Sequence, residues 1–160
     1  MKYHRLTHEQ FSELHHEFAV FLASQGLDKK QWEAIKKNKS KRIDQLLDLF
    51  SDLVWDQYVR DCKYLEYSAT NQLFLFKITS DKAYTFILKT ENPSIDFTKT
   101  ETVYDIFQNY ELDQFSILEG SKTYDTNALD FVYDYIKKGA VKTEGVYFKA
   151  LERYFSNSSK

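Results

Sequence analysis

Apolar residues near the start of the chain recur with the period of an α-helix. In THEQFSELHHEFAVFLASQG, Phe11, Leu14 and Phe18 are spaced three and four positions apart and therefore share one helical face. Thr7 is followed three residues later by Gln10, which is the spacing of a capping box. The pattern predicts an amphipathic helix that begins just after Thr7.

Two further helices are predicted before the pattern changes. Gly26 ends the first segment, and Asp28 is the expected N-cap of LDKKQWEAIKKNK. Ser40 can cap SKRIDQLLDLFSDLVWDQYVRDC, whose apolar residues form one broad face. The N-terminal part, residues 1–62, is therefore predicted to hold three helices.

The central segments have the composition of β-strands. KYLEYSA, QLFLFKIT and AYTFILKT are rich in aromatic and β-branched residues, and turn signals separate them. They predict three antiparallel strands in a meander, and QFSILEG predicts a fourth, short strand.

Helical patterns return towards the C-terminus. TKTETVYDIFQNYEL is predicted to be a helix with Thr100 as its cap. TNALDFVYDYIKKGA carries Lys137 and Lys138 in its last turn, with Gly139 just after them, and TEGVYFKALERYFS predicts a final helix. Helices at both ends of a central set of strands indicate an α+β fold rather than alternating βαβ units. We expect a single domain, residues 1–160, with a helical part (1–62) and a strand-helix part (63–160).

The composition favours an ordinary hydrophobic core in a reducing compartment. Aromatic residues make up 17% of the chain, and each buried ring contributes a large area. Cys62 is the single cysteine, so no disulfide within the chain and no CxxC motif are available. The opening MKYHRLTHEQ lacks the apolar core of a signal peptide, and no apolar run approaches a membrane span. We expect a soluble cytoplasmic protein without a membrane partner.

No linear motif for catalysis or for a cofactor is present. GxSxG, GxGxxG and GxxxxGK are all missing, and Cys62 is predicted at a helix C-terminus, where the dipole disfavours a thiolate. We therefore expect no catalytic residues, no cofactor and no enzyme activity, although acid–base pairs assembled only by the fold remain an alternative.

Histidines and aromatic residues give weak signals of binding sites. The histidines lack a third and fourth ligand at metal-site spacing, so we interpret them as surface or boundary residues: His4, His8, His15 and His16. The strand aromatics could stack nucleobases, but the RRM signature is missing and a core role is favoured. They are Tyr64, Tyr67, Phe74, Phe76, Tyr84 and Phe86.

An acidic stripe runs along the third predicted helix. Asp44, Asp48, Asp52 and Asp56 recur every fourth residue, which places four like charges on one face. Like charges at this spacing cost a few tenths of a kcal/mol per pair. A solvated face is the simplest interpretation. The alternatives are contact with a protein partner, with basic residues of the same chain, or with a metal. Our prediction for these four residues is contact with a partner.

Basic residues concentrate between the second and third predicted helices. Residues 29–42, which we call the basic corner, carry a net charge of +6, and the rest of the chain carries −8. Such a patch is typical of a phosphate-binding surface. Its cations are Lys29, Lys30, Lys36, Lys37, Lys39, Lys41 and Arg42.

The helix dipole explains only part of the basic corner. Lys36 and Lys37 complement the C-terminus of the second helix, but Lys41 and Arg42 fall in the first turn of the third, where positive charge is unfavourable. A solvated surface, RNA or another polyanion, and a protein partner all remain open.

Three segments resemble a known family. MKYHRLTHEQFSELHHEFAVFLASQG, LLDLFSDLVWD and NQLFLFKI are similar to a family of small uncharacterised bacterial proteins, classed as a domain of unknown function. The resemblance runs through most of the chain. It implies a bacterial cytoplasmic protein with one domain, and it transfers no catalytic residue.

Together these features predict a non-catalytic protein that docks on a larger assembly. The basic corner would contact ribosomal RNA or the ribosome through phosphates. A protein–protein adaptor or homo-oligomeric module is the first alternative, and an enzyme without a linear motif is the second.

Overall fold

The computed structural model describes residues 2–38, 41–109 and 111–158. Contacts divide the chain into two compact units, Met1–Tyr58 and Val59–Lys160. We call them the helical unit and the sheet unit. The expectation of one domain stays a prediction. No helix within the described ranges is long and apolar enough to cross a membrane.

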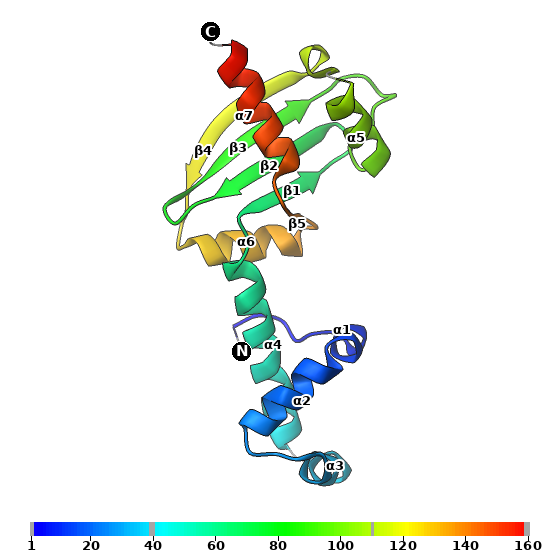
Figure 1. The fold of residues 1–160 in the computed structure, drawn as a ribbon, viewed down its shortest axis with the longest axis vertical. Coiled ribbons are helices and arrows are strands. Elements are labelled where there is room, and N and C mark those ends of the chain that lie inside the picture. The colour runs from blue at the N-terminus through cyan, green and yellow to red at the C-terminus, as the bar shows by residue number, and fades with distance from the viewer. Residues whose placement is uncertain (1, 39–40, 110, 159–160) are drawn as a thin grey trace. The chain divides into compact units, whose positions relative to one another are not determined.

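The described residues of the helical unit form four helices where the sequence predicted three (Figure 1). They are α1 (His8–Glu13), α2 (His15–Ser24), α3 (Lys29–Lys37) and α4 (Lys41–Arg60). The first predicted helix is divided because Leu14, with φ −101° and ψ 22°, leaves the helical conformation. His15 supports the break, since its Nδ1 lies 3.0 Å from the Ser12 carbonyl oxygen.

The predicted helix starts of this unit are mostly confirmed. Thr7 with Gln10 and Asp28 with Gln31 each form a complete capping box at α1 and α3. The predicted cap of α4, Ser40, lies outside the described residues.

Aromatic rings fill the core of the helical unit. Phe18 packs against Phe50 with ring centroids 5.0 Å apart, and Phe21 packs against Phe50 at 5.3 Å. Trp32 meets Phe18 edge-on at 5.3 Å. These contacts join α2, α3 and α4 in one core.

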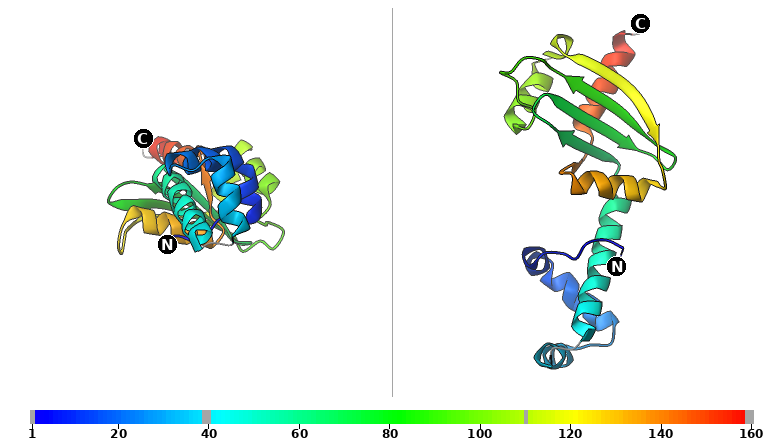
Figure 2. Two further views of the ribbon diagram at one scale, coloured as in Figure 1. Left: turned by 90° about the horizontal axis from the view of Figure 1, so that it is seen from below. Right: turned by 180° about the vertical axis from the view of Figure 1, so that it is seen from behind.

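The sheet unit is built on a five-stranded antiparallel sheet in the order β4-β3-β2-β1-β5 (Figure 2). The strands are β1 (Tyr64–Ser68), β2 (Gln72–Ile78), β3 (Lys82–Lys89), β4 (Ser116–Thr123) and β5 (Val141–Thr143). The α+β class and the meander are as predicted. The fifth strand was not predicted because three residues are too few to show a strand pattern.

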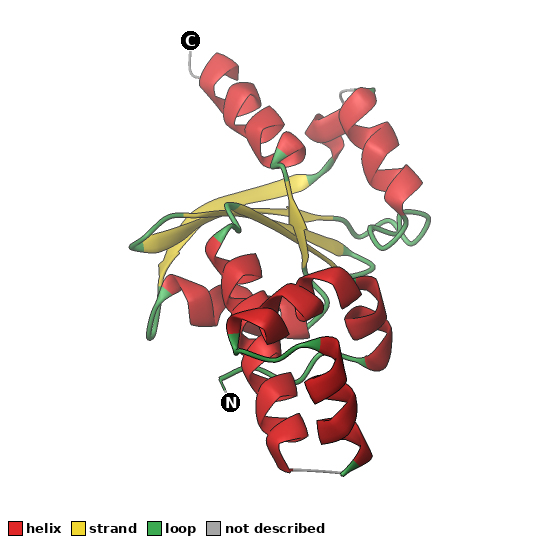
Figure 3. Cartoon of the chain, turned by 60° about the horizontal axis from the view of Figure 1, so that its bottom comes forward, coloured by secondary structure: helices red, strands yellow, loops and turns green. Residues whose placement is uncertain are grey.

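Helices cover the two faces of the sheet separately (Figure 3). They are α5 (Thr100–Gln108), α6 (Ala128–Lys137) and α7 (Val146–Ser158), with a short 3-10 helix, η1 (Glu111–Gln114). Phe148 of α7 contacts Tyr64 and Phe86 on one face, whereas Tyr135 of α6 contacts Phe76 on the other. The strand aromatics are thus divided between two faces and form no single stacking platform.

The predicted start of α5 is wrong in its capping residue, whereas the predicted end of α6 is confirmed. Thr100 does not cap α5, because Lys99 occupies the N-cap position and no side-chain hydrogen bond closes that end. The C-terminal signals of α6 are confirmed, since Lys137 lies in its last turn and Gly139 follows with φ 109°. A positive φ of this kind favours glycine.

The path of α6 follows from the strand order. It leads from β4 at one edge of the sheet to β5 at the opposite edge. Four strand spacings of about 4.8 Å require a connection of about 19 Å. The ten residues of α6 supply about 15 Å of helix. This crossing places β5 beside β1, where it borders the cavity described below.

Candidate functional site

The basic corner of the helical unit lies at the ends of two helices. Its first four lysines are on α3 and its last two cations are on α4. All six described cations have exposed side chains, and Lys39 lies outside the described residues. The six are Lys29, Lys30, Lys36, Lys37, Lys41 and Arg42.

Among the lysines of the basic corner that the structure describes, one has an acidic partner and the others have none among the described residues. Lys36 pairs with Glu33 at 3.0 Å, and this is the acid that lies within the segment. Lys29, Lys30, Lys37 and Lys41 form no ion pair with any residue that the structure describes.

Helix polarity confirms the unfavourable placement of several cations. Lys29 and Lys30 open α3, and Lys41 and Arg42 open α4. A cation at a helix N-terminus opposes the dipole, with a cost of about 0.3–1 kcal/mol. Lys37, in contrast, closes α3 and complements the dipole. Helix stability therefore does not account for the cations in the two first turns.

Trp32 is partly exposed, but its ring packs into the core of the helical unit. Its ring is half-buried against Phe18, and the Lys36 ammonium lies 5.8 Å from the ring centroid. The edge contact fixes the orientation of α3 and leaves the lysines on the outward side.

The acidic stripe of α4 contacts the N-terminal segment of the same chain. Arg5 pairs with Asp48 at 2.6 Å and with Asp44 at 3.1 Å. Lys2 pairs with Asp56 at 3.3 Å. The intramolecular alternative, which the sequence left open, thus explains the stripe. Partner contact by Asp44, Asp48, Asp52 and Asp56 stays a prediction, but it is no longer needed to account for them.

Asp52 makes the most specific of these contacts. Its two carboxylate oxygens accept the backbone N–H groups of Lys2 and Tyr3, each at 2.9 Å. Beside it in the chain, the Ser51 hydroxyl is fully buried, accepts the Leu6 N–H at 3.0 Å and donates to the Leu47 carbonyl at 2.7 Å. The carboxylates and the hydroxyl together hold an extended segment against α4.

Among the described residues, no group of three or more His, Cys, Asp or Glu side chains could hold a metal ion. His4 instead lies against Trp55, with ring centroids 4.8 Å apart. Burial raises the pKa of the Cys62 thiol to about 11, so the thiolate is not available near neutral pH.

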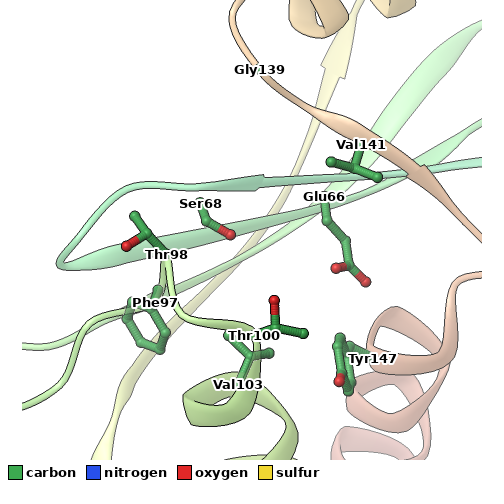
Figure 4. A pocket seen from close by; sticks show the side chains of 9 residues that line it. All are labelled: Glu66, Ser68, Phe97, Thr98, Thr100, Val103, Gly139, Val141 and Tyr147. Carbon is green, nitrogen blue, oxygen red and sulfur yellow. The ribbon is translucent and has the colours of Figure 1, made fainter.

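The sheet unit contains a cavity that no sequence pattern indicated (Figure 4). Its volume is about 410 Å³, within the usual range for small-molecule sites. β1, the loop before α5, α5, the residues around β5, and α7 all contribute to its walls. The lining residues are Glu66, Ser68, Phe97, Thr98, Thr100, Val103, Gly139, Val141 and Tyr147.

Glu66 is the ionisable carboxylate of this cavity, which we call the Glu66 cavity. Strand alternation points it to the face covered by α5 and α7, where its register partners are Leu75 on β2 and Val141 on β5. In Figure 4 the side chain extends from β1 towards Thr100 and Tyr147. Burial raises its pKa above the usual value for a glutamate.

Within the described part of the chain, nothing donates a hydrogen bond to the Glu66 carboxylate or pairs with it. An apolar side chain would suit this position on the sheet face better, since Leu75 beside it is fully buried. The carboxylate therefore costs folding free energy that no contact within the described structure offsets.

Tyr147 forms the wall opposite the strand. Its ring stacks on Phe107 of α5 with centroids 4.4 Å apart. Burial raises the pKa of Tyr147, and the charges of Glu66 and Tyr104 raise it further. The phenol therefore stays protonated and can donate a hydrogen bond.

A larger cavity of about 590 Å³ borders Tyr147 between α5 and α7. Its charged lining residue is Arg153, which is exposed on α7. It does not combine burial with a partnerless charge, so the Glu66 cavity is the stronger candidate.

These features describe an α+β protein whose helical unit carries a basic corner and whose sheet unit contains the Glu66 cavity. The chain belongs to a family whose model matches residues 1–156 and which is described as a family of unknown function (DUF6495). No curated protein and no solved structure matches the chain.

Proposed function

We propose that the protein is a non-catalytic, cytoplasmic binding protein whose basic corner docks on RNA, with ribosomal RNA as the most concrete partner. The observation that carries this proposal is the set of exposed lysines that form no ion pair with any described residue: Lys29, Lys30, Lys37 and Lys41.

Local pairing of the acids strengthens the positive field of the corner. The acidic stripe binds Lys2, Arg5 and two backbone N–H groups. Because these groups neutralise the carboxylates along α4, the acidic stripe lowers the positive potential of the basic corner only slightly. A compensated stripe beside uncompensated lysines supports attraction of a polyanion.

The chemistry of the corner suits phosphate contacts rather than base readout. Lysine ammonium groups act as point charges without the planar fork of arginine, and Trp32 is engaged by Phe18. Contacts of this kind position a protein on RNA without reading its sequence. We therefore expect affinity that depends steeply on salt and weakly on sequence.

Removing the lysine charges should weaken RNA binding by at least about tenfold at low salt and flatten its salt dependence. Each phosphate contact that is lost should lower the slope of log affinity against log salt by about 0.7 on single-stranded RNA. The measurement is fluorescence anisotropy with a labelled RNA over a salt series, together with cosedimentation with ribosomes. The variant is Lys29→Gln, Lys30→Gln, Lys37→Gln and Lys41→Gln combined.

A matched control has the same change in net charge on the sheet unit. It combines Lys63→Gln, Lys89→Gln, Lys99→Gln and Lys122→Gln. If both variants lose affinity equally, net charge rather than the corner is responsible. If the wild type does not bind ribosomes at low salt, the proposal fails. A nuclease-resistant acidic protein partner would instead favour the adaptor alternative.

A pair of single substitutions on α3 separates binding from stability. Lys29→Gln removes a cation from the first turn and should raise the free energy of unfolding by about 0.3–1 kcal/mol, whereas Lys37→Gln removes one from the last turn and should lower it by a similar amount. Lysine and glutamine have similar helix propensities, so the dipole dominates the comparison. Urea unfolding at low ionic strength measures both.

Both α3 variants should weaken RNA binding despite their opposite effects on stability. A solvated surface would give the same stability changes with RNA affinity unchanged, and that result would count against the docking proposal.

A further inference from the structure

We infer that the Glu66 cavity binds a small organic cation, an ammonium or guanidinium compound whose charged group pairs with Glu66. This site lies wholly in the sheet unit and does not use the basic corner, so it goes beyond the proposed RNA docking. Its basis is a carboxylate that pairs with no residue described by the structure, in a cavity whose walls carry an aromatic ring and hydroxyl groups (Figure 4).

The charge of the cavity favours a cationic ligand. Glu66 is the lining residue that carries a charge at neutral pH, and Tyr147 stays protonated because burial and Glu66 raise its pKa. An ammonium group beside Glu66 would supply the counter-charge that the described residues do not provide. Pairing inside a half-enclosed cavity is stronger than pairing at a surface, because solvent screens it less.

Three nearby lysines of the sheet unit form no ion pair with Glu66. Lys149 of α7 lies on the same face as Glu66, but its ammonium lies over the Tyr64 ring, 5.1 Å from the centroid. Lys142 pairs in register with Leu65, so strand alternation directs it to the opposite face of the sheet from Glu66. Lys138 extends its ammonium over the Tyr135 ring, 4.8 Å from the centroid, on the side of α6.

The other walls match the rest of an organic cation. Tyr147 provides aromatic surface, which attracts cations and packs against an apolar body. The hydroxyl groups of Ser68 and Thr100 supply hydrogen-bond donors and acceptors, whereas the Thr98 hydroxyl is engaged by Asp96. Polar groups at fixed positions among apolar side chains would set the orientation of a ligand.

A metal ion fits the site less well than an organic cation. Hard cations such as Ca²⁺ take about six to eight oxygen ligands, so a site for them needs several carboxylate and carbonyl groups. The described lining supplies one carboxylate, and no described cluster of three metal-ligating side chains exists. The volume of about 410 Å³ instead suits a molecule with several carbon atoms.

The test is NMR titration of the full-length protein with benzylammonium, with n-butylguanidinium as a second cation and benzyl alcohol as a neutral analogue. Both cations should shift the amide resonances of Thr100, Val141 and Tyr147, whereas benzyl alcohol should not. Glu66→Gln should weaken binding of both cations at least tenfold. Glu119→Gln has the same change in net charge at an exposed site on β4 and should bind like the wild type.

Folding of the Glu66→Gln variant is expected to be intact. A glutamate whose pKa is raised in the folded state binds its proton more tightly there, so stability falls as pH rises from the unfolded pKa through the folded one. The neutral amide avoids that loss and should be at least as stable as the wild type at pH 7. Thermal unfolding of both proteins checks this before the titration.

Binding should also weaken as pH falls through the raised pKa of Glu66, because protonation removes the attracting charge. The groups beside Glu66 are Tyr147 from α7, which stays protonated, and the uncharged Thr100, Val141 and Leu75 from α5, β5 and β2. Other titratable groups on this face include Lys149 of α7, which lies over the Tyr64 ring, and Tyr104 of α5, whose charge acts on Tyr147. The primary ammonium keeps its charge over this range.

Three results would overturn the inference. The first is no shift of cavity resonances at about 10 mM benzylammonium, where a site of about 1 mM affinity would be roughly 90% occupied. The second is equal binding by Glu66→Gln, and the third is benzyl alcohol binding as tightly as the cation, which would show an apolar cavity without charge recognition.

Discussion

Replacing Gly145 with alanine is expected to destabilise the sheet unit by about 2–4 kcal/mol. Gly145 precedes α7 with φ 77°, a conformation that costs an L-residue about 1–2 kcal/mol. An added Cβ would also lie 2.5 Å from the Tyr64 ring. That ring packs against Phe148 and lies under the Lys149 ammonium, so it has little room to move. Urea unfolding followed by circular dichroism measures the loss.

Gly139→Ala is the matched control for this prediction. Gly139 also has a positive φ, 109°, but an added Cβ there would meet nothing within 4 Å. It belongs to the same unit, so both variants report on the same unfolding transition. We expect Gly139→Ala to show the backbone strain alone. Equal losses in the two variants would show that the approach of Tyr64 to Gly145 does not matter.

Local signals in the sequence predicted most of the helices and strands. The capping boxes at Thr7 and Asp28 are confirmed because each depends on residues only three positions apart. The break at Leu14 was not predicted, since an apolar residue in the helical register gives no sign that its backbone leaves the helix. Thr100 had the chemistry of a cap, but α5 begins one residue earlier than that role requires.

The two candidate sites differ in how far sequence could reveal them. The basic corner is contiguous in sequence, so a count of charges was enough to find it. The Glu66 cavity joins β1 to segments that lie far along the chain, and Glu66 in KYLEYSA has the pattern of an exposed strand residue. Only the packing of α5 and α7 on that face, together with β5, encloses it.

The acidic stripe was visible in the sequence, but the groups that neutralise it were not. Its four-residue period was visible, and so was its unfavourable self-repulsion. The compensating groups lie some 40 or more residues earlier, in a segment with no helix or strand pattern. An extended segment that is held by hydrogen bonds to side chains has no periodicity by which it could be predicted.

Replacing Asp52 with asparagine should destabilise the helical unit by about 2–4 kcal/mol. The carboxylate accepts two backbone N–H groups, from Lys2 and Tyr3, and charge-assisted hydrogen bonds contribute about 1.5–3 kcal/mol each. An amide has one oxygen, so it can accept from one donor while its NH₂ group faces the other. The N-terminal segment should then detach from α4, with loss of hydrogen-exchange protection at Tyr3 and Leu6.

Asp44→Asn removes the same charge from the same stripe and is the control for Asp52→Asn. Asp44 is largely exposed and contacts Arg5 as a surface ion pair, so its loss should cost no more than about 1 kcal/mol. If the two variants are equally stable, the stripe acts only through its summed charge. If Asp52→Asn alone releases the segment, α4 holds the N-terminus through specific hydrogen bonds. In that case RNA affinity should also fall, because Lys2 and Arg5 leave the stripe and its carboxylates then oppose the positive charge of the basic corner.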